Sequence, residues 1–403
     1  MSAVRSTRRG PALRVEAHTG RESLEALRLP WQALQQAAPD ATPYQTWEWI
    51  EAWWQVYHPR KRFLLLALYS GPDLVALAPM YVSRHLRTPL RRLAWAGTGR
   101  SDYLGPLIAP GFHAEAASSL LQYLQNELPG WDYADLQQLA PGSPMLAGID
   151  TATPEAWDRH LSPMEPCPYL SLPASHTDFL ASLGKSMRSN LRYYAKLAAR
   201  EAAEPHYSVA DTASLAADMD ALFALHGQRW NARLMPGVLS NSRVQLFHRE
   251  VAARFLERGW LRLHTLSMDG KAQAALYCFS FKGRIYYYLG GFAPEMARYS
   301  LGTLLTGEAI RCAIEEGCSE FDFLRGGEPY KARWKPAVRM NHRLILLREY
   351  GGAEAWKQVA GRAGLLVNQC ERMVERTAKR VAANAGRSRA KPAARTGEEA
   401  AAR

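Results

Sequence analysis

One short segment, residues 320–336 (EFDFLRGGEPYKARWKP), brings together side chains that could act as acids, bases and hydrogen-bond donors. Its candidate catalytic residues are Asp322, Glu328, Tyr330 and Lys331. A carboxylate, a phenol and an amine this close together offer a base, a proton donor and a group that stabilises an oxyanion. The paired glycines Gly326 and Gly327 let the backbone approach a ligand closely. The alternative is a solvated loop with salt bridges, and the spacing alone leaves both open.

A second segment, residues 290–310, could hold an anion at the start of a helix. A predicted strand ends at two glycines, and a turn then leads to a predicted helix N-terminus. Unpaired N–H groups and the positive end of the helix dipole suit a pyrophosphate there. The predicted binding residues are Gly290, Gly291, Arg298, Ser300, Gly302 and Thr303. The alternative is an ordinary helix with a serine cap.

A third segment, residues 184–200 (GKSMRSNLRYYAKLAAR), is strongly basic. Its cations recur every three or four residues and therefore share one face of a predicted helix; they are Lys185, Arg188, Arg192, Lys196 and Arg200. No acid appears until Glu201. A solvated basic face, a contact to a substrate phosphate, membrane lipid and RNA all fit this pattern.

Several catalytic and metal-binding signatures are absent from the sequence. It contains no GxSxG, HExxH, P-loop or GxGxxG motif. The 11 histidines are dispersed, and the 5 cysteines form no CxxC pair, so the sequence indicates neither a metal site nor a disulfide framework. This cysteine usage fits a reducing cytoplasm.

The elements that must position these groups repeat in two halves. In the first half we predict helices at 23–36, 47–57 and 114–127, and strands at 63–69, 74–82, 90–96 and 133–139. In the second half we predict helices at 175–183, 186–201, 213–230, 242–258 and 302–316, and strands at 261–268, 272–281, 284–291, 320–324 and 341–350. Alternating residues mark the strands and a 3.6-residue period marks the helices. The order predicts an α/β fold of two tandem units, each a mixed, mostly antiparallel sheet flanked by helices.

The predicted domains follow from this repeat. A proline-rich stretch at 154–173 separates an N-terminal domain, residues 12–165, from a C-terminal domain, residues 166–350. Residues 351–383 carry an apolar stripe and predict a helix packed on the body, with a dimer seam or a membrane-surface helix as alternatives. Residues 1–11 and 384–403 are predicted to be a disordered leader and a disordered basic tail.

Charge and hydropathy restrict the class of protein. The 403 residues carry a formal net charge of +12, but about half of it lies in the two predicted tails, and much of the rest on the basic helix. This distribution argues little for a general nucleic-acid-binding surface. Apolar runs such as residues 63–69 are far shorter than the roughly 20 residues of a membrane-spanning helix. The N-terminus lacks a secretory signal pattern, so we expect a cytoplasmic protein.

Longer motifs carry a resemblance to a known family. The order LGKSMRSNLR, FALHGQRW, RGWLRLHTLSMDGKAQAALYCFSFKGRIYYYLGGF and LGTLLTGEAIRCAIEEGCSEFDFLRGGEPYKARW resembles the CelD/BioF2-like acetyltransferase family of the GNAT superfamily. That family is similar to the FemAB peptidyltransferases. The match covers about residues 175–340, and YQTWEWIEAWWQVY and SDYLGPLIAPG resemble the family's N-terminal half.

The resemblance implies a GNAT-type N- or O-acyltransferase with acetyl-CoA, or another acyl-CoA, as co-substrate and no metal. The strand around Tyr288 would bind the pantetheine arm, and the helix at Gly302 its pyrophosphate. Glu328, or Asp322 through a water, would accept the proton of an amine or hydroxyl. Lys331 would stabilise the oxyanion, and Tyr330 or Tyr288 would protonate the leaving group. The acceptor implied by the family is a cell-envelope or exopolysaccharide precursor.

The predicted substrate-binding residues come from the basic helix, the family motifs and the 320–336 segment. They are Arg325, Trp230, Arg188, Arg192, Asp102, Tyr103 and Trp334. The partners expected are therefore a small-molecule donor and acceptor, with peripheral membrane association open and the oligomeric state unknown.

Two departures from the family pattern keep rival functions open. Gly327 stands where the family reads RG-acid-E-x-Y-K, and Gly302 lacks the second small residue of the Q/R-x-x-G-x-G/A loop. A non-catalytic accessory protein of polysaccharide biosynthesis is one rival. The other is a FemAB-like transferase that uses aminoacyl-tRNA, with the basic helix on the RNA. The chain lacks the long coiled-coil arm of some FemAB enzymes, which favours CoA.

Overall fold

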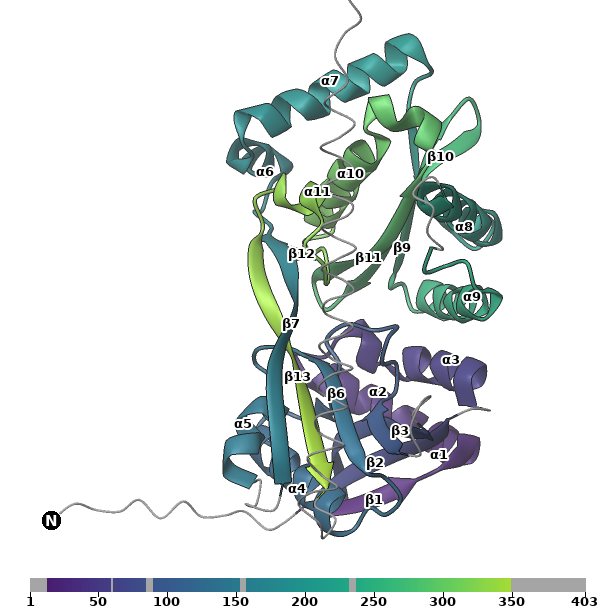
Figure 1. Cartoon of the computed structure of the whole chain (residues 1–403). Helices are drawn as coiled ribbons and strands as arrows, with labels where there is room; N and C mark the ends of the chain where they lie inside the picture. Colours follow the sequence, from purple (N-terminus) through teal and green to yellow (C-terminus); the bar gives the residue numbers. More distant parts are fainter. Residues whose placement is uncertain (1–12, 59–60, 85–89, 153–156, 232–236, 349–403) are drawn as a thin grey trace, which may run out of the picture. The chain divides into compact units, whose positions relative to one another are not determined.

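A single mixed sheet runs through both halves of the chain (Figure 1). The computed structural model describes residues 13–58, 61–84, 90–152, 157–231 and 237–348. Within these residues the sheet has 13 strands in the order β1-β2-β3-β4-β6-β13-β7-β12-β11-β10-β9-β8, with β5 paired to β3. The predicted helix at 351–383 and the two predicted tails lie outside the described residues.

The strands span β1 Arg14–His18, β2 Arg62–Ser70, β3 Asp73–Arg84, β4 Arg91–Trp95, β5 Leu107–Ile108, β6 Tyr133–Leu139, β7 Trp157–Ser171, β8 His206–Val209, β9 Leu261–Met268, β10 Lys271–Phe281, β11 Arg284–Phe292, β12 Glu320–Asp322 and β13 Ala337–Arg348. The α-helices span α1 Gly20–Ala26, α2 Arg28–Ala37, α3 Trp47–Tyr57, α4 His113–Asn126, α5 Pro144–Ala152, α6 His176–Ser182, α7 Lys185–Glu201, α8 Leu215–Asn231, α9 Ser242–Glu257, α10 Leu301–Glu315 and α11 Pro329–Ala332. Short 3-10 helices occupy Pro43–Gln45 and Pro294–Tyr299.

The two halves repeat one topology, as the sequence predicts. In the first half, β2, β3 and β4 form an antiparallel meander, α4 follows, and β6 pairs with β4 in parallel. In the second half, β9, β10 and β11 form the meander, α10 follows, and β12 pairs with β11 in parallel. The other strand pairs are antiparallel within the described residues, so the sheet is mixed and mostly antiparallel.

Strands β7 and β13 join the halves, and they run side by side in Figure 1. β13 follows the elements of the second half but pairs with β6 of the first half, while β7 pairs with β12 of the second. The predicted boundary between residues 165 and 166 therefore falls inside a strand of 15 residues. The register of β13 against β7 shifts opposite Pro163 and Pro166, where a proline cannot donate to the ladder.

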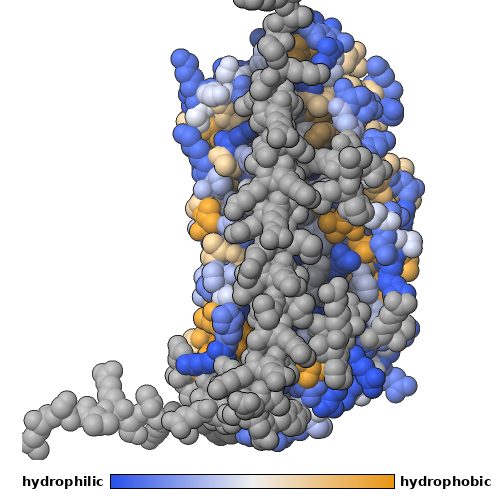
Figure 2. Space-filling model, in the orientation of Figure 1, coloured by the Kyte–Doolittle hydropathy of each residue, from blue (hydrophilic) through white to orange (hydrophobic). Residues whose placement is uncertain are grey.

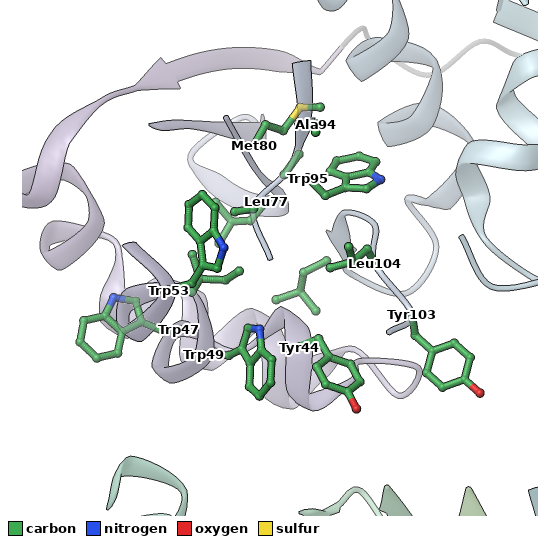
Figure 3. Close-up of a cluster of buried hydrophobic side chains, with 14 of the residues drawn as sticks. Tyr44, Trp47, Trp49, Trp53, Leu77, Met80, Ala94, Trp95, Tyr103 and Leu104 are labelled. Carbon is green, nitrogen blue, oxygen red and sulfur yellow. The ribbon is translucent and has the colours of Figure 1, made fainter. Parts of the chain in front are cut away.

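Helices cover both faces of the second half of the sheet. α8 packs on β10 and β11, whereas α10 packs on β9, β10 and β11 and also contacts α6 and α7. The larger of two hydrophobic cores contains bulky side chains from α3. Trp49 and Trp53 of this helix are buried there, beside Tyr44 of the preceding turn (Figure 3). Trp49 also meets Phe247 of α9 and Phe279 of β10 edge-on, so this core extends from the first half into the second.

The segment Ser101–Leu104 is fixed by that core. Trp49 Nε1 donates to Ser101 Oγ at 2.8 Å, and Leu104 N donates to Gln138 O of β6 at 2.9 Å. β4 and β6 are in register only at Arg92–Tyr133 and Leu93–Ala134. The buried residues Tyr103 and Leu104 thus lie beside β6 beyond the point where its pairing with β4 ends.

Candidate functional site

An opening in the sheet forms where β11 and β12 separate. Their parallel register runs from Arg284–Glu320 to Tyr286–Asp322 and then ends, although β11 continues to Phe292. The register of β10 against β11 shifts at the same level, because Tyr277 faces Leu289 and Cys278 faces Tyr287. Tyr288 is therefore the extra residue of a β-bulge, a feature that leaves one residue outside the ladder and often lies next to active sites.

A pocket of about 220 Å³ lies beside this opening. Its walls come from β11, from the segment after β12, from α8 and from α11. The lining residues are Asp102, His226, Arg229, Trp230, Val238, Tyr287, Tyr288, Leu289, Gly290, Phe323, Leu324, Arg325, Glu328, Tyr330 and Lys331. We call this the catalytic pocket. It brings together Lys331, Glu328, Tyr330, Tyr288, Gly290, Arg325, Trp230 and Asp102 from the sequence-predicted set.

Two carboxylates line the catalytic pocket in different environments. Asp102 is buried, and its Oδ1 lies 3.1 Å from Arg325 Nε. Burial raises the pKa of Asp102, and the charges of Arg325 and Lys331 oppose that rise only in part. The Glu328 side chain is 52% exposed, and its Oε2 lies 2.8 Å from Lys331 Nζ. The pocket therefore holds one buried carboxylate from the first half and one exposed carboxylate from the second.

Lys331 is already fully engaged by its own loop. Its Nζ donates to the carbonyl oxygens of Leu324 at 3.2 Å, Arg325 at 2.9 Å and Gly326 at 3.1 Å, and it also contacts Glu328. An ammonium group has three N–H donors. In this arrangement no donor is left for an oxyanion, so the geometry does not support the role predicted for Lys331. Its contacts instead hold the loop that carries Arg325.

Asp322 lies behind the pocket wall and does not line the pocket. It is completely buried; its Oδ2 accepts from Tyr103 Oη at 2.7 Å, and its Oδ1 accepts from Leu324 N at 2.7 Å. Burial raises the pKa of Asp322 to about 6, although Arg339 and the bond from Tyr103 act in the opposite direction. With both oxygens occupied, Asp322 ties the first half to the second. Its predicted role as a base through a water has no support in this geometry.

The phenols of the pocket are kept protonated. Tyr287 and Tyr330 are hydrogen-bonded to each other, and burial raises the pKa of Tyr287 to about 12 and also raises that of Tyr330. Tyr288 Oη donates to Arg100 O at 2.7 Å, and burial raises its pKa as well. Of the two predicted proton donors, Tyr288 thus has its proton committed to a carbonyl, whereas Tyr330 shares its proton with another phenol.

Sequence reasoning missed His226, which lies in the quoted FALHGQRW motif. Trp230 Nε1, which can only donate, lies 3.0 Å from His226 Nε2. The neutral imidazole must therefore carry its proton on Nδ1, a buried atom without a partner among the described residues. Burial, helped by the charge of Arg229, lowers the pKa of His226 to about 4. His226 therefore lines the pocket as a neutral imidazole at neutral pH, and its Nδ1 lies next to Gly237, where an added Cβ would be 2.8 Å away. The HxxxW spacing, about one helical turn, is the signal in the sequence that could have found this pair.

The predicted pyrophosphate residues separate into two groups. Gly290 lines the pocket, but Gly291 packs under α8, where an added Cβ would lie 2.4 Å from His226 N. Ser300 adopts a left-handed conformation before α10, and its side chain does not cap the helix. Thr303 N donates to Ser300 O at 2.8 Å, and the first turn also contains Gly302. The helix start thus remains uncapped by Ser300, as an anion site requires.

Three residues that the sequence predicts to bind a ligand contact other parts of the protein instead; they are Arg298, Arg188 and Trp334. Arg298 lies 3.3 Å from Glu201 at the end of α7, and Arg188 Nη1 donates to Ala181 O at 2.8 Å, which caps α6. Trp334 is buried and stacks near Phe179, so it belongs to the core rather than to a substrate surface. Arg192 is exposed on α7, and hydrophilic residues predominate around this helix in Figure 2.

The described residues offer neither a metal-binding cluster nor a membrane-spanning helix. No three His, Cys, Asp or Glu side chains gather there in a group that could hold a metal ion. None of the described helices combines the length and the apolar character needed to cross a membrane.

Comparison with known families identifies the second half. Residues 185–332 match the family described as an acetyltransferase (GNAT) domain. The match covers less than half of the chain, and it makes this region similar to a GNAT acetyltransferase domain. The GNAT-like region runs from α7 to α11 and includes every residue of the catalytic pocket except Asp102. The acyltransferase class predicted from the sequence is thereby confirmed, while donor and acceptor stay predictions.

Solved structures show that the fold extends beyond the GNAT-like region. The crystal structure of FemX is similar over 85% of this chain and 99% of FemX, with a TM-score of 0.61 and 10% identity. L-PGS from Bacillus licheniformis is similar over 85% of this chain and 96% of its own, with a TM-score of 0.51 and 13% identity. At these identities the likeness shows the fold alone. No curated protein matches the sequence.

Proposed function

We propose that the chain transfers an acyl group, in the simplest case acetyl, from acyl-CoA to an amine or hydroxyl. The observation that carries this proposal is the opening between β11 and β12, which leads directly to a pocket with a buried carboxylate and paired phenols. A pantetheine arm fits an opening of this kind, because the bulged edge of β11 offers backbone groups that no strand covers. The uncapped start of α10 suits the pyrophosphate.

Asp102 is the group that accepts the proton of the attacking amine or hydroxyl. Its raised pKa brings it closer to neutral pH, where a general base works best. Glu328 was the first choice from the sequence, but its carboxylate is held by Lys331. This assignment gives the first half of the chain a direct part in the chemistry, because Asp102 lies on the Ser101–Leu104 segment.

The phenol pair completes the reaction. The nucleophile forms a bond to the thioester carbon, the carbon–sulfur bond breaks, and the thiolate takes a proton from Tyr330, which is in turn bonded to Tyr287. Backbone N–H groups at the Tyr288 bulge are the donors for the oxyanion. Such donors are typically worth about 10²-fold each in rate.

Acyl-CoA binding and acyl transfer can be tested separately. Calorimetric titration of the full chain with acetyl-CoA should show saturable binding. Radiolabelled acetyl-CoA incubated with a small-molecule extract should then yield a labelled product. Asp102→Asn should lower the rate about 10²-fold with an unchanged dissociation constant for the donor. The matched variant Glu328→Gln should change the rate less than tenfold.

Failure of each step has a distinct meaning. If no acyl-CoA binds, the donor is wrong, whatever the variants do. If acetyl-CoA binds but Asp102→Asn reacts as fast as wild type, the donor stands and the base is wrong. If binding occurs without any transfer, and Gly327→Asp creates transfer, the accessory-protein alternative gains support, because that change restores the acid of the family pattern.

An aminoacyl-tRNA donor remains the second candidate. It is favoured by the exposed cations Lys185, Arg192, Lys196 and Arg200 on α7 and by the similarity of the fold to FemX. Retention of tRNA that falls steeply with salt would support it, since each phosphate contact releases a counterion. Loss of that retention in Arg192→Glu would place the RNA on α7, and a flat salt dependence would exclude this donor.

A further inference from the structure

A second cavity, larger than the catalytic pocket, lies between the sheet and three loops of the first half. It has a volume of about 480 Å³ and shares no lining residue with the catalytic pocket. Its sheet side presents Tyr169 of β7, Arg284 and Tyr286 of β11, Glu320 of β12 and Arg339 of β13. The facing loops are residues 38–42, 103–108 and 140–144. We call it the arginine cavity.

Arg284 enters this cavity without a carboxylate partner. Its guanidinium is hydrogen-bonded to the phenol of Tyr286, and the described residues place no carboxylate oxygen within 4.0 Å of it. Glu320, the residue beside it in the β11–β12 register, is instead bonded to Arg339 Nη2. Burial by itself would lower the pKa of Arg284, but its contact with Tyr286 and the charge of Glu320 outweigh burial and raise that pKa, so Arg284 is positively charged at neutral pH.

Arg339 has an unused donor at the same wall. Its guanidinium stacks over the Tyr169 ring at 3.9 Å from the centroid, while Nη2 contacts Glu320. Its buried Nε has no hydrogen-bond partner among the described residues. Arg339 Nη2 also lies 3.6 Å from Asp322 Oδ2, so Arg339 is paired with two carboxylates, and Arg284 is the guanidinium of this wall that forms no ion pair within 4.0 Å among the described residues. An oxyanion in the cavity would give the Arg284 guanidinium a charged acceptor, and guanidinium groups bind carboxylates and phosphates in this way.

We propose that the arginine cavity binds a small molecule that carries a carboxylate or phosphate group, with the oxyanion on Arg284. The volume lies in the range of small-molecule sites. The rest of the lining suits a polar, hydroxylated body, because polar residues such as His113, Ser143 and Gln45 are among the residues that line it. The proposal does not depend on acyl transfer, since binding can be measured without any donor.

Three sugars of equal ring size test the charge requirement. The full chain is titrated by calorimetry with glucose 6-phosphate, glucuronate and glucose at constant ionic strength. We expect saturable binding of one or both charged sugars and none of glucose. Binding of glucose 6-phosphate alone identifies a phosphate ligand, and binding of glucuronate alone a carboxylate. Absence of binding by both charged sugars, or equal binding of glucose, overturns the proposal.

Variants locate the site. Arg284→Gln should weaken the charged sugar about 10- to 100-fold, the usual range for a lost hydrogen bond to a charged group. Arg284→Lys keeps the charge but loses the fork of donors, so an intermediate affinity is expected, and it serves if Arg284→Gln does not fold. Arg243→Gln removes the same charge from an exposed position on α9 and should change nothing. Equal weakening by Arg243→Gln and Arg284→Gln would mean non-specific attraction and would refute the site.

Discussion

The variant Lys331→Ala tests whether Lys331 stabilises its loop or takes part in catalysis. The variant removes the ammonium group and leaves the carbonyl oxygens of Leu324, Arg325 and Gly326 without their donor. A buried polar group without a partner costs roughly 1–3 kcal/mol, and the ion pair with the half-exposed Glu328 adds at most about 1 kcal/mol. Two of the three carbonyl contacts are only partly buried. We therefore expect a loss of about 2–4 kcal/mol in the free energy of unfolding.

Urea unfolding at pH 7 measures this loss, with the midpoint and slope fitted separately. Glu328→Gln is the first control, because it removes only the half-exposed partner and should cost at most about 1 kcal/mol. Lys196→Ala, an exposed lysine on α7, should stay within about 0.5 kcal/mol of wild type. If Lys331→Ala unfolds like wild type but loses about 10²-fold or more in turnover, the loop does not need the lysine. The ammonium then acts on the substrate, as first predicted.

Three further predictions concern buried positions. The folded-state pKa of Asp322 is raised from 3.8 to about 6, so its contribution to stability is complete below pH 4 and is lost as pH rises through 6. Asp322→Asn should therefore gain about 2 kcal/mol relative to wild type between pH 4 and pH 7, and an equal difference at both pH values in urea unfolding would contradict this. Gly291→Ala should cost about 1–3 kcal/mol by overpacking against α8, whereas Gly327→Ala, whose added Cβ would meet only Pro166 at 3.6 Å, should be nearly neutral in a thermal melt. Trp334→Ala should lower the free energy of unfolding by about 3–5 kcal/mol without selectively raising KM. A raised KM at unchanged stability would mean that Trp334 contacts the substrate.

Elements with strong local signals were predictable from the sequence. The helix at Trp47–Tyr57 and the strand at Tyr133–Leu139 match their predicted bounds. The turns at Asp269-Gly270 and Lys282-Gly283 have positive φ at both residues, as tight hairpins require. The predicted helix at 23–36 is divided into α1 and α2 at Leu27, and the expected loop at 325–336 contains α11.

Features that depend on distant parts of the chain were not predictable. The prolines of β7 favour a linker, yet β7 pairs with β12 and β13, strands that follow it by about 150 to 190 residues. Asp102 was grouped with Tyr103 as a substrate contact. The structure instead directs Asp102 to the catalytic pocket and Tyr103 to Asp322 and the arginine cavity. Tyr103 has a φ of 51°, and no residue pattern signals that turn.

We expect the position of Ser101–Leu104 to limit each chain to one acyl donor. In the second half, the gap between the parallel strands β11 and β12 is the opening of the catalytic pocket. In the first half, Leu104 bonds to β6 beyond the end of its pairing with β4, so the corresponding gap is occupied by the chain itself. The segment Ser101–Leu104 thus fills the gap beside β6 in the first half, and its Asp102 lines the pocket of the second half. A titration with acyl-CoA should accordingly saturate at one equivalent per chain, although the fold contains the unit twice.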